Sequence, residues 1–215
     1  SIIIPSSVVC IEEKAFLMCN NLQYVEFAPN SKLKIIENEA FCYSTVNRIF
    51  IPSKLEELKE EWCKGLYCLK TINVSNKNES FKFLESKILV GKSEKNLKDF
   101  DDLIFANRDI KSIFIPSYIK RIKPNAFYMC ENLQEVEFAT NSKLNSIGKK
   151  SFAYSSVNKI IIPDEVHQIE EEAFLCSKIK KIKFSSKSNL SILGEKAFSL
   201  SHIESIIIPK KCQYN

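Results

Sequence analysis

The sequence predicts an α/β repeat solenoid, in which each repeat adds one strand to a parallel sheet and one turn or short helix to the opposite side. Three observations lead to this fold class. Segments 5–52 and 116–163 match each other closely, and the match places Phe16 on Phe127. Large aromatic residues recur at short, nearly regular intervals. Between them lie short alternating apolar runs of the kind that form strands.

The key aromatic residues mark the repeat, and most of them follow an alanine. The one long gap, between Trp62 and Phe127, leaves room for two degenerate repeats. The key aromatics are Phe16, Phe41, Trp62, Phe127, Phe152, Phe174 and Phe198. Apart from that gap, their spacing falls within the period of roughly 20–29 residues that is typical of solenoids, whose repeats cannot bury their apolar faces alone.

Each repeat contains two apolar parts. The first has the spacing of Val8, Ile11, Ala15 and Phe16, and this mixed spacing predicts a turn or a short helix. The second part is L-x-x-I-x-I/F, whose alternation and β-branched residues predict a short strand. Eight such strands are expected, and they end at Phe27, Ile51, Val74, Ile115, Phe138, Ile162, Phe184 and Ile208. Several are followed by proline, which cannot continue a strand ladder.

Residues 76–107 interrupt the pattern because they contain no Ala-Phe pair. They carry two short apolar runs, 86–90 and 103–106, separated by polar residues and Gly91. We interpret the segment as an irregular, hairpin-like unit. It is either a decayed repeat or a protruding binding element, and the former is favoured because insertions in repeat arrays usually form loops.

Segment 113–136, IFIPSYIKRIKPNAFYMCENLQEV, resembles the BspA-like (Treponema pallidum type) leucine-rich repeats, and segment 2–25 matches the same pattern. The resemblance implies a right-handed, curved array with a concave parallel sheet and convex turns or short helices. No segment has the composition of a linker, so we expect a single leucine-rich-repeat domain over residues 1–215. Both ends are apolar strands without a polar capping repeat, so we expect a fragment of a longer array, the alternative being chains that associate end to end. Departures from the family pattern are Glu12 and Lys123, where glycine is common, and Trp62 in a repeat one residue short.

Composition limits the kinds of partner. The net charge of +5 comes from 31 basic and 26 acidic residues that are interspersed, and the pI is near 8.7. A nucleic-acid-binding protein usually has a basic stripe and a higher pI, so we expect no nucleic acid as partner. No apolar run reaches the roughly 18 residues of a membrane span, so we expect no direct membrane insertion. The sequence makes no prediction of oligomeric state.

Eight cysteines follow the phase of the repeat and predict a file of small buried thiols behind the key aromatics. Cys63 and Cys68 are close enough in sequence to form a disulfide, and Cys212 is expected to be exposed. The spacing of the cysteines fits no usual zinc pattern, so no metal and no cofactor are expected.

The two histidines, His167 and His202, have no partner at ligand spacing, so an enzyme would need a cluster assembled across repeats.

The candidate binding site is the concave face, where the alternate residues of each strand point outward. The outward pairs are Tyr24 and Glu26, Arg48 and Phe50, Thr71 and Asn73, Ser112 and Phe114, Glu135 and Glu137, Lys159 and Ile161, Lys181 and Lys183, and Ser205 and Ile207. All of these except Thr71, Asn73 and Ser205 are candidate ligand-binding residues. Large apolar residues beside charges are typical of protein contact sites, although strand propensity explains them nearly as well.

Three hypotheses for function follow. The first is a non-catalytic scaffold that binds a host, matrix or cell-surface protein through the concave face, which the resemblance implies for a cell-surface or secreted adhesive protein. The second is an intracellular or structural interaction repeat in the cytoplasm. The third is an enzyme, which we do not expect. Three glycosylation sequons, at Asn73, Asn78 and Asn189, favour secretion weakly, and a glycan on Asn73 would stand on the binding face.

Overall fold

The computed structural model describes residues 1–209 and 213–214, which form strands and turns and contain no helix. The chain divides into two compact units, residues 1–100 and 101–215. The architecture is a parallel-strand β-solenoid of about 8 turns that resembles leucine-rich repeats. The predicted repeat solenoid is therefore confirmed, and its helical part is not.

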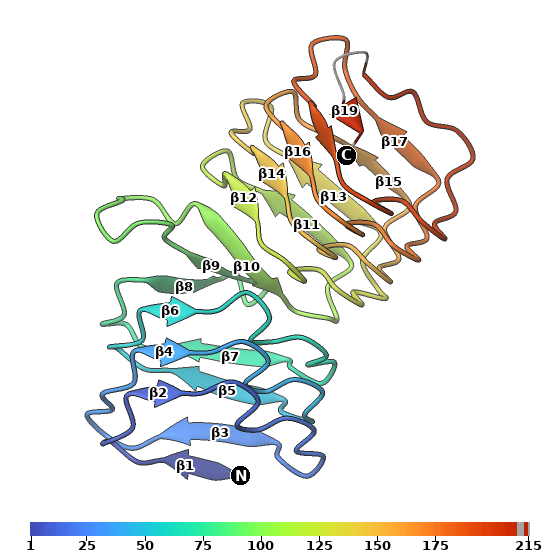
Figure 1. The fold of residues 1–215 in the computed structure, drawn as a ribbon. Helices are drawn as coiled ribbons and strands as arrows, with labels where there is room; N and C mark the ends of the chain where they lie inside the picture. The colour runs from blue at the N-terminus through green and yellow to red at the C-terminus, as the bar shows by residue number, and fades with distance from the viewer. Residues whose placement is uncertain (210–212, 215) are drawn as a thin grey trace. The chain divides into compact units, whose positions relative to one another are not determined.

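The first unit contains two parallel sheets that share its turns (Figure 1). The long-strand sheet consists of β1 (Ile2–Ile4), β3 (Tyr24–Phe27), β5 (Arg48–Ile51) and β7 (Thr71–Val74). The short-strand sheet consists of β2 (Cys10–Ile11), β4 (Ile35–Ile36) and β6 (Glu57–Leu58). β1 and β5 end immediately before Pro5 and Pro52, as the ladder-stopping role of proline predicts.

The second unit repeats this arrangement. Its long-strand sheet consists of β11 (Ser112–Ile115), β13 (Glu135–Phe138), β15 (Lys159–Ile161) and β17 (Lys181–Lys183). Its short strands are β10 (Asp102–Ala106), β12 (Arg121–Ile122), β14 (Ser146–Ile147), β16 (Gln168–Ile169), β18 (Ile192–Leu193) and β19 (Gln213–Tyr214). The strand expected to end at Ile208 is reduced to a single bridge between Lys181 and Ser205.

The core of each unit lies between its two sheets and contains the key aromatic residues. Phe41, Phe127, Phe152 and Phe174 are completely buried, and Trp62 is nearly so. Rings from successive turns stack almost in parallel, with centroids 4.7 Å apart for Phe127 and Phe152 and 5.1 Å apart for Phe152 and Phe174. The same stacking joins Phe16 to Phe41 in the first unit, at 5.2 Å. This file confirms the predicted repeat register.

The expected short helices do not form. The turns around the key aromatic residues, called the Ala-Phe turns below, have left-handed backbone conformations at two positions in most repeats. In one turn these are Asn125 (φ 60°) and Met129 (φ 55°), and the same pair recurs at Lys150 and Tyr154. A left-handed residue interrupts a right-handed helix. The backbone N–H of Phe127 instead donates to the carbonyl oxygen of Ser151 in the next turn, at 2.7 Å.

The irregular segment does contain a hairpin, but its strands differ from the expected ones. β8 (Phe81–Leu84) pairs antiparallel with β9 (Ile88–Gly91). The run at 86–90 thus finds its partner on its N-terminal side, across a tight turn at Glu85 and Ser86, both with positive φ. The run at 103–106 belongs to β10, which pairs in parallel with β12 and begins the regular short-strand sheet of the second unit.

Candidate functional site

The candidate site is the outer face of each long-strand sheet, where alternation separates core residues from exposed ones. In β11, Ile113 and Ile115 are buried while Ser112 and Phe114 are exposed. β5 shows the same alternation. Every candidate residue predicted from the sequence is exposed, and Thr71 is half-buried. Their role in binding remains a prediction.

Strand pairing arranges the outward residues in two rows that run across each sheet. The register pairs Tyr24 with Arg48 and Arg48 with Thr71 in the first unit. In the second unit, the first row is continuous from Ser112 through Glu135, Lys159 and Lys181 to Ser205. The second row contains the register pairs Phe50–Asn73, Phe114–Glu137 and Ile161–Lys183. Residues distant in sequence therefore form one surface within each unit.

The second row carries large apolar side chains in contact with solvent. Phe114 is 57% exposed, Ile161 is 56% exposed and Ile207 is 87% exposed, while Phe50 is less open. The sequence prediction missed Ile3, which pairs with Glu26 and is 63% exposed. A signal for Ile3 was present, since the internal match that places Phe16 on Phe127 also places Ile3 on Phe114. In the strand register these apolar side chains are interspersed with charged ones such as Glu26, Glu137 and Lys183, and such a mixture is typical of protein contact surfaces.

Charged residues on this outer face are unpaired in the second unit. Glu135, Glu137, Lys159, Lys181 and Lys183 form no ion pair with any described residue. In the first unit, the guanidinium carbon of Arg48 lies 5.5 Å from the centre of the Tyr24 ring, within the range of a cation–π contact.

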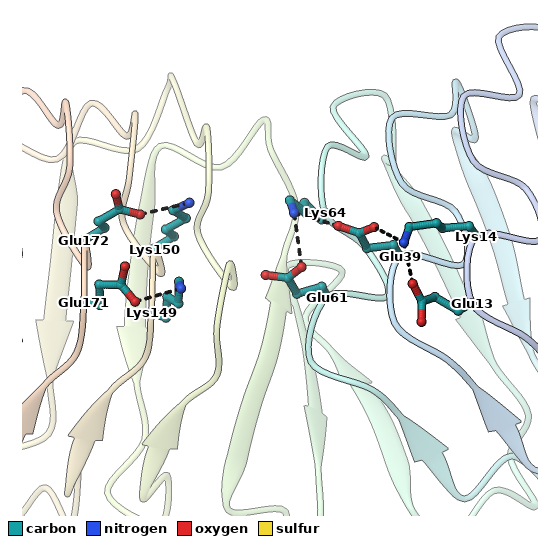
Figure 2. A network of polar contacts seen from close by, with 9 residues as sticks. All are labelled: Glu13, Lys14, Glu39, Glu61, Lys64, Lys149, Lys150, Glu171 and Glu172. Atoms are coloured by element: carbon teal, nitrogen blue, oxygen red, sulfur yellow. Dashed lines mark hydrogen bonds and ion pairs between the residues drawn. The ribbon is translucent and has the colours of Figure 1, made fainter.

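Charged residues on the Ala-Phe turns, by contrast, pair between neighbouring turns (Figure 2). In the second unit, Lys149 bridges to Glu171 at 2.7 Å and Lys150 to Glu172 at 2.9 Å. The hydrogen bond from Lys149 lowers the pKa of Glu171. These turn charges therefore compensate one another within the unit.

The first unit has a corresponding network, in which Lys64 bridges Glu39 at 2.7 Å and Glu61 at 3.1 Å, as Figure 2 shows. The hydrogen bond with Lys64 lowers the pKa of Glu39 and raises the pKa of Lys64. These lysines and glutamates of the turns are therefore paired, in contrast to the charged residues on the outer face of the second unit.

A cleft opens where two long strands separate. β13 and β15 pair only between Glu135 and Lys159. Beyond this point lies a cleft of about 850 Å³, lined by Glu137 and Ile161 from the outer face and by the loops that follow both strands. β3 and β5 also separate early, beside a smaller cleft of about 300 Å³ that includes Phe50. In both cases the connection between the two separating strands is one residue longer than the connection between the first of them and the long strand before it.

The cysteines occupy the predicted inner layer only in part. Cys42, Cys63 and Cys130 are buried, Cys10, Cys19 and Cys176 are half-buried, and Cys68 is exposed. All seven are free thiols, so the possible pairing of Cys63 with Cys68 is absent, since one side chain lies in the core and the other faces solvent. Burial raises the pKa of the Cys42 thiol to about 11. Cys212 lies outside the described residues.

The histidines lie at separate exposed positions. The Nδ1 atom of His167 is 2.7 Å from the carbonyl oxygen of Glu165 and 3.2 Å from the amide nitrogen of Asn145. These neighbours are neutral, and neither is a nucleophile. Over residues 1–209, no cluster of three or more His, Cys, Asp or Glu residues has the geometry to hold a metal ion. The same residues contain no helix that could cross a membrane.

The three sequons differ in accessibility. Asn73 is exposed on the outer face of β7, and Asn189 is half-buried. Asn78 is buried, and its amide nitrogen donates to the carbonyl oxygens of Pro52 (2.7 Å) and Leu55 (3.0 Å). Its side-chain oxygen accepts the backbone N–H groups of Ser80 and Phe81. In the folded protein the side chain of Asn78 therefore joins two turns through hydrogen bonds.

Comparison with known families gives one match. The model for the BspA type leucine-rich repeat region matches residues 1–109 and 98–214, with six copies of the repeat. No curated protein matches the chain. The family match covers nearly the whole chain.

Solved structures of bacterial proteins share the fold. The pneumococcal vaccine antigen PcpA superposes with a TM-score of 0.72 at 20% sequence identity, covering 99% of this chain and 61% of that one. A leucine rich cell surface protein from Faecalibacterium prausnitzii A2-165 gives a TM-score of 0.70 at 22% identity, covering 99% of this chain and 58% of that one. A leucine-rich repeat protein from Eubacterium ventriosum gives a TM-score of 0.58 at 17% identity, covering 98% of this chain and 79% of that one. The chain thus spans less than two thirds of the first two proteins.

Proposed function

This chain belongs to the BspA type leucine-rich repeat family, and we propose that it is a non-catalytic scaffold that binds a protein through the outer faces of its long-strand sheets. The family architecture suits protein interaction. Solenoids present extended surfaces on which neighbouring repeats contribute to one contact. Binding therefore depends on outward side chains from several turns, not on any single loop.

The observation that carries this proposal is the exposure of large apolar side chains among unpaired charges. Phe114 and Ile161 are each more than half exposed, although the core of the solenoid does not require them there. Protein interfaces combine apolar contacts with polar and charged groups in this way. Strand propensity also accounts for a phenylalanine or an isoleucine in a strand, so substitution is the deciding test.

The partner we propose is a protein on a host cell, in a matrix or on another cell, and the place of action is the cell surface or the extracellular medium. Two of the solved structures that share the fold are a vaccine antigen and a cell surface protein, which supports this proposal. Adhesion would depend on many weak contacts spread over the sheet faces, because such contacts add up when several are made at once.

An intracellular interaction repeat is the second candidate, and the free thiols favour it. The seven described cysteines are all unbonded, including the exposed Cys68. Disulfides are common in secreted proteins, whereas exposed free thiols are typical of reducing compartments. The two candidates differ in location and partner, but both use the same face.

The proposal is tested by the triple substitution Phe50→Ser, Phe114→Ser and Ile161→Ser. Beads coated with the protein are applied to cultured epithelial cells and to a panel of immobilised matrix proteins. We expect wild-type beads to adhere, and the triple variant to lose adhesion by at least about tenfold, because truncated apolar anchors carry much of the binding free energy. Circular dichroism and melting temperature should stay close to wild type.

A matched control replaces three exposed apolar residues on the turns, Leu17→Ser, Met18→Ser and Leu200→Ser. This control should adhere like wild type. Equal adhesion by both variants would move the binding site away from the sheet faces. Absence of adhesion by wild-type beads would reject the adhesive function and leave the intracellular candidate.

A further inference from the structure

The outer face of the second unit separates its charges by strand. β13 presents Glu135 and Glu137, whereas β17 presents Lys181 and Lys183, and β15 between them presents Lys159. Two further lysines, at 178 and 180, are exposed in the segment just before β17. We call Lys159, Ile161, Lys181 and Lys183 the β17 basic face. Such a separation of charge selects partners by complementarity.

Strand register holds two lysines of this face directly opposite each other. Lys159 pairs with Lys181, and adjacent strands lie about 4.8 Å apart. Like charges directly opposite on neighbouring strands destabilise a sheet. The lysines on the Ala-Phe turns avoid this cost because Lys149 and Lys150 each bridge to a glutamate. A bound carboxylate would relieve the repulsion on the β17 basic face.

The nearby acidic residues form no ion pair with this face. Glu135 is the register partner of Lys159 on its other side, and the backbone N–H of Glu204 donates to the carbonyl oxygen of Lys180. Neither carboxylate forms an ion pair with a lysine of the face. Lys181 has Ser205 as its neighbour on the next turn, and Lys183 pairs with Ile161. The positive charge of β17 is therefore open to solvent.

We infer that the β17 basic face binds an acidic, extended segment of a partner protein. This inference rests on the proposed binding function and specifies the chemistry of the partner. Lys181 and Lys183 are two residues apart on one strand, which places their side chains about 7 Å apart on the same face. An extended chain with a carboxylate at every second residue has the same spacing. An apolar residue in that segment contacts the exposed side chain of Ile161.

A protein segment fits this surface better than a nucleic acid does. Glu135 and Glu137 lie on β13, beside the basic strands, and would repel a phosphate backbone that continued across the sheet. Nucleic-acid grooves combine basic residues with aromatic platforms for the bases. On the outer face of this unit the exposed aromatic residue is Phe114, which lies on β11, beyond the acidic strand. A short acidic peptide can remain on β15 and β17 and avoid β13.

The test uses the whole chain and a fluorescein-labelled peptide of about twelve residues, in which glutamate alternates with serine around one central leucine. Fluorescence anisotropy measures its dissociation constant for wild type and for the double variant Lys181→Glu and Lys183→Glu. The control variant, Lys32→Glu and Lys77→Glu, makes the same change in net charge at exposed lysines of the first unit. A peptide with lysine in place of glutamate and a single-stranded oligonucleotide complete the set of probes.

We expect the acidic peptide to bind wild type and the control variant equally, and the β17 variant at least about tenfold more weakly. Added salt should weaken wild-type binding, because the face is exposed. Equal binding of the acidic peptide by wild type, the control variant and the β17 variant would overturn the inference. Equal binding of the acidic and the lysine peptide by wild type would also overturn it. Tighter binding of the oligonucleotide than of the acidic peptide would assign the face to nucleic acid. If the acidic peptide fails but adhesion still depends on Phe50, Phe114 and Ile161, only the partner chemistry is wrong.

Discussion

Phe127 shows how a single residue joins successive repeats. Its side chain is completely buried, its ring stacks on Phe152, and its backbone N–H donates to the carbonyl oxygen of Ser151 in the next turn. Side chain and backbone therefore connect the same two turns. Asn78 has a comparable role with polar groups, because its amide bonds to the preceding turn and to its own.

Replacing Phe127 with alanine should lower the free energy of unfolding by about 3–5 kcal/mol, because the truncation leaves a cavity in the aromatic file. Urea denaturation followed by circular dichroism measures the change. Glu135→Ala is the matched control on the exposed face and should change stability by no more than about 0.5 kcal/mol. An unchanged midpoint for Phe127→Ala would show that the repeat register is wrong.

At the scale of elements, the long strands and the turns have different roles. The long strands provide the outward rows, while the Ala-Phe turns connect neighbours through backbone hydrogen bonds and ion pairs. The left-handed residues at Asn125 and Met129 make this connection possible, since they direct N–H groups toward the next turn and away from a helical pattern. The turn edge is therefore structural, and the sheet face remains available for binding.

The ion pair between Glu39 and Lys64 predicts a pH dependence. The hydrogen bond with Lys64 lowers the pKa of Glu39 in the folded state below its ordinary value of 4.5. Its contribution is therefore complete above that value and is lost as the pH falls through the lowered pKa. Glu39→Gln should cost up to about 1 kcal/mol at pH 7 and less at pH 3, where a larger share of Glu39 is protonated. Urea midpoints at both pH values measure this.

Glu137→Gln is the control for this experiment, because Glu137 is exposed and forms no ion pair with the described residues. Its substitution should leave the difference between the two pH values as in wild type. A Glu39 variant whose deficit stays constant between pH 7 and pH 3 would show that the ion pair contributes nothing to stability.

The two units of the whole molecule are related by the internal sequence match that places Phe16 on Phe127. Each unit repeats the sheets, the aromatic file and the early separation of two long strands. Thiols are distributed through both units, and those of the described residues form no disulfides. The described part of the solenoid is therefore held together by stacking of neighbouring turns and not by covalent links.

Thiol titration tests this property of the whole molecule. After denaturation without reductant, at least the seven described cysteines should react with a thiol reagent. In the native protein Cys68 should react first, because it is exposed. Cys42 and Cys130 should react slowly, since burial shields both and raises the pKa of each thiol. Fewer than seven reactive thiols in the denatured protein would reveal a disulfide.

Sequence periodicity by itself determined the repeat, the strands and the outward residues, because a strand alternates its side chains and a buried core enforces that alternation. It also placed Phe127 and its counterparts in one file. It did not determine the conformation of the turns, since the mixed spacing of Ile11, Ala15 and Phe16 fits a helix as well as a series of left-handed turns.

Only the tertiary structure decided features that depend on contacts between turns. The hairpin partner of 86–90 depends on which edge is free to pair, and the burial of Asn78 depends on carbonyl groups from the preceding turn. The same holds for charge: Lys149 and Lys181 look alike in the sequence, but the first faces Glu171 and the second faces Lys159. That difference in neighbours separates a structural charge from one available to a partner.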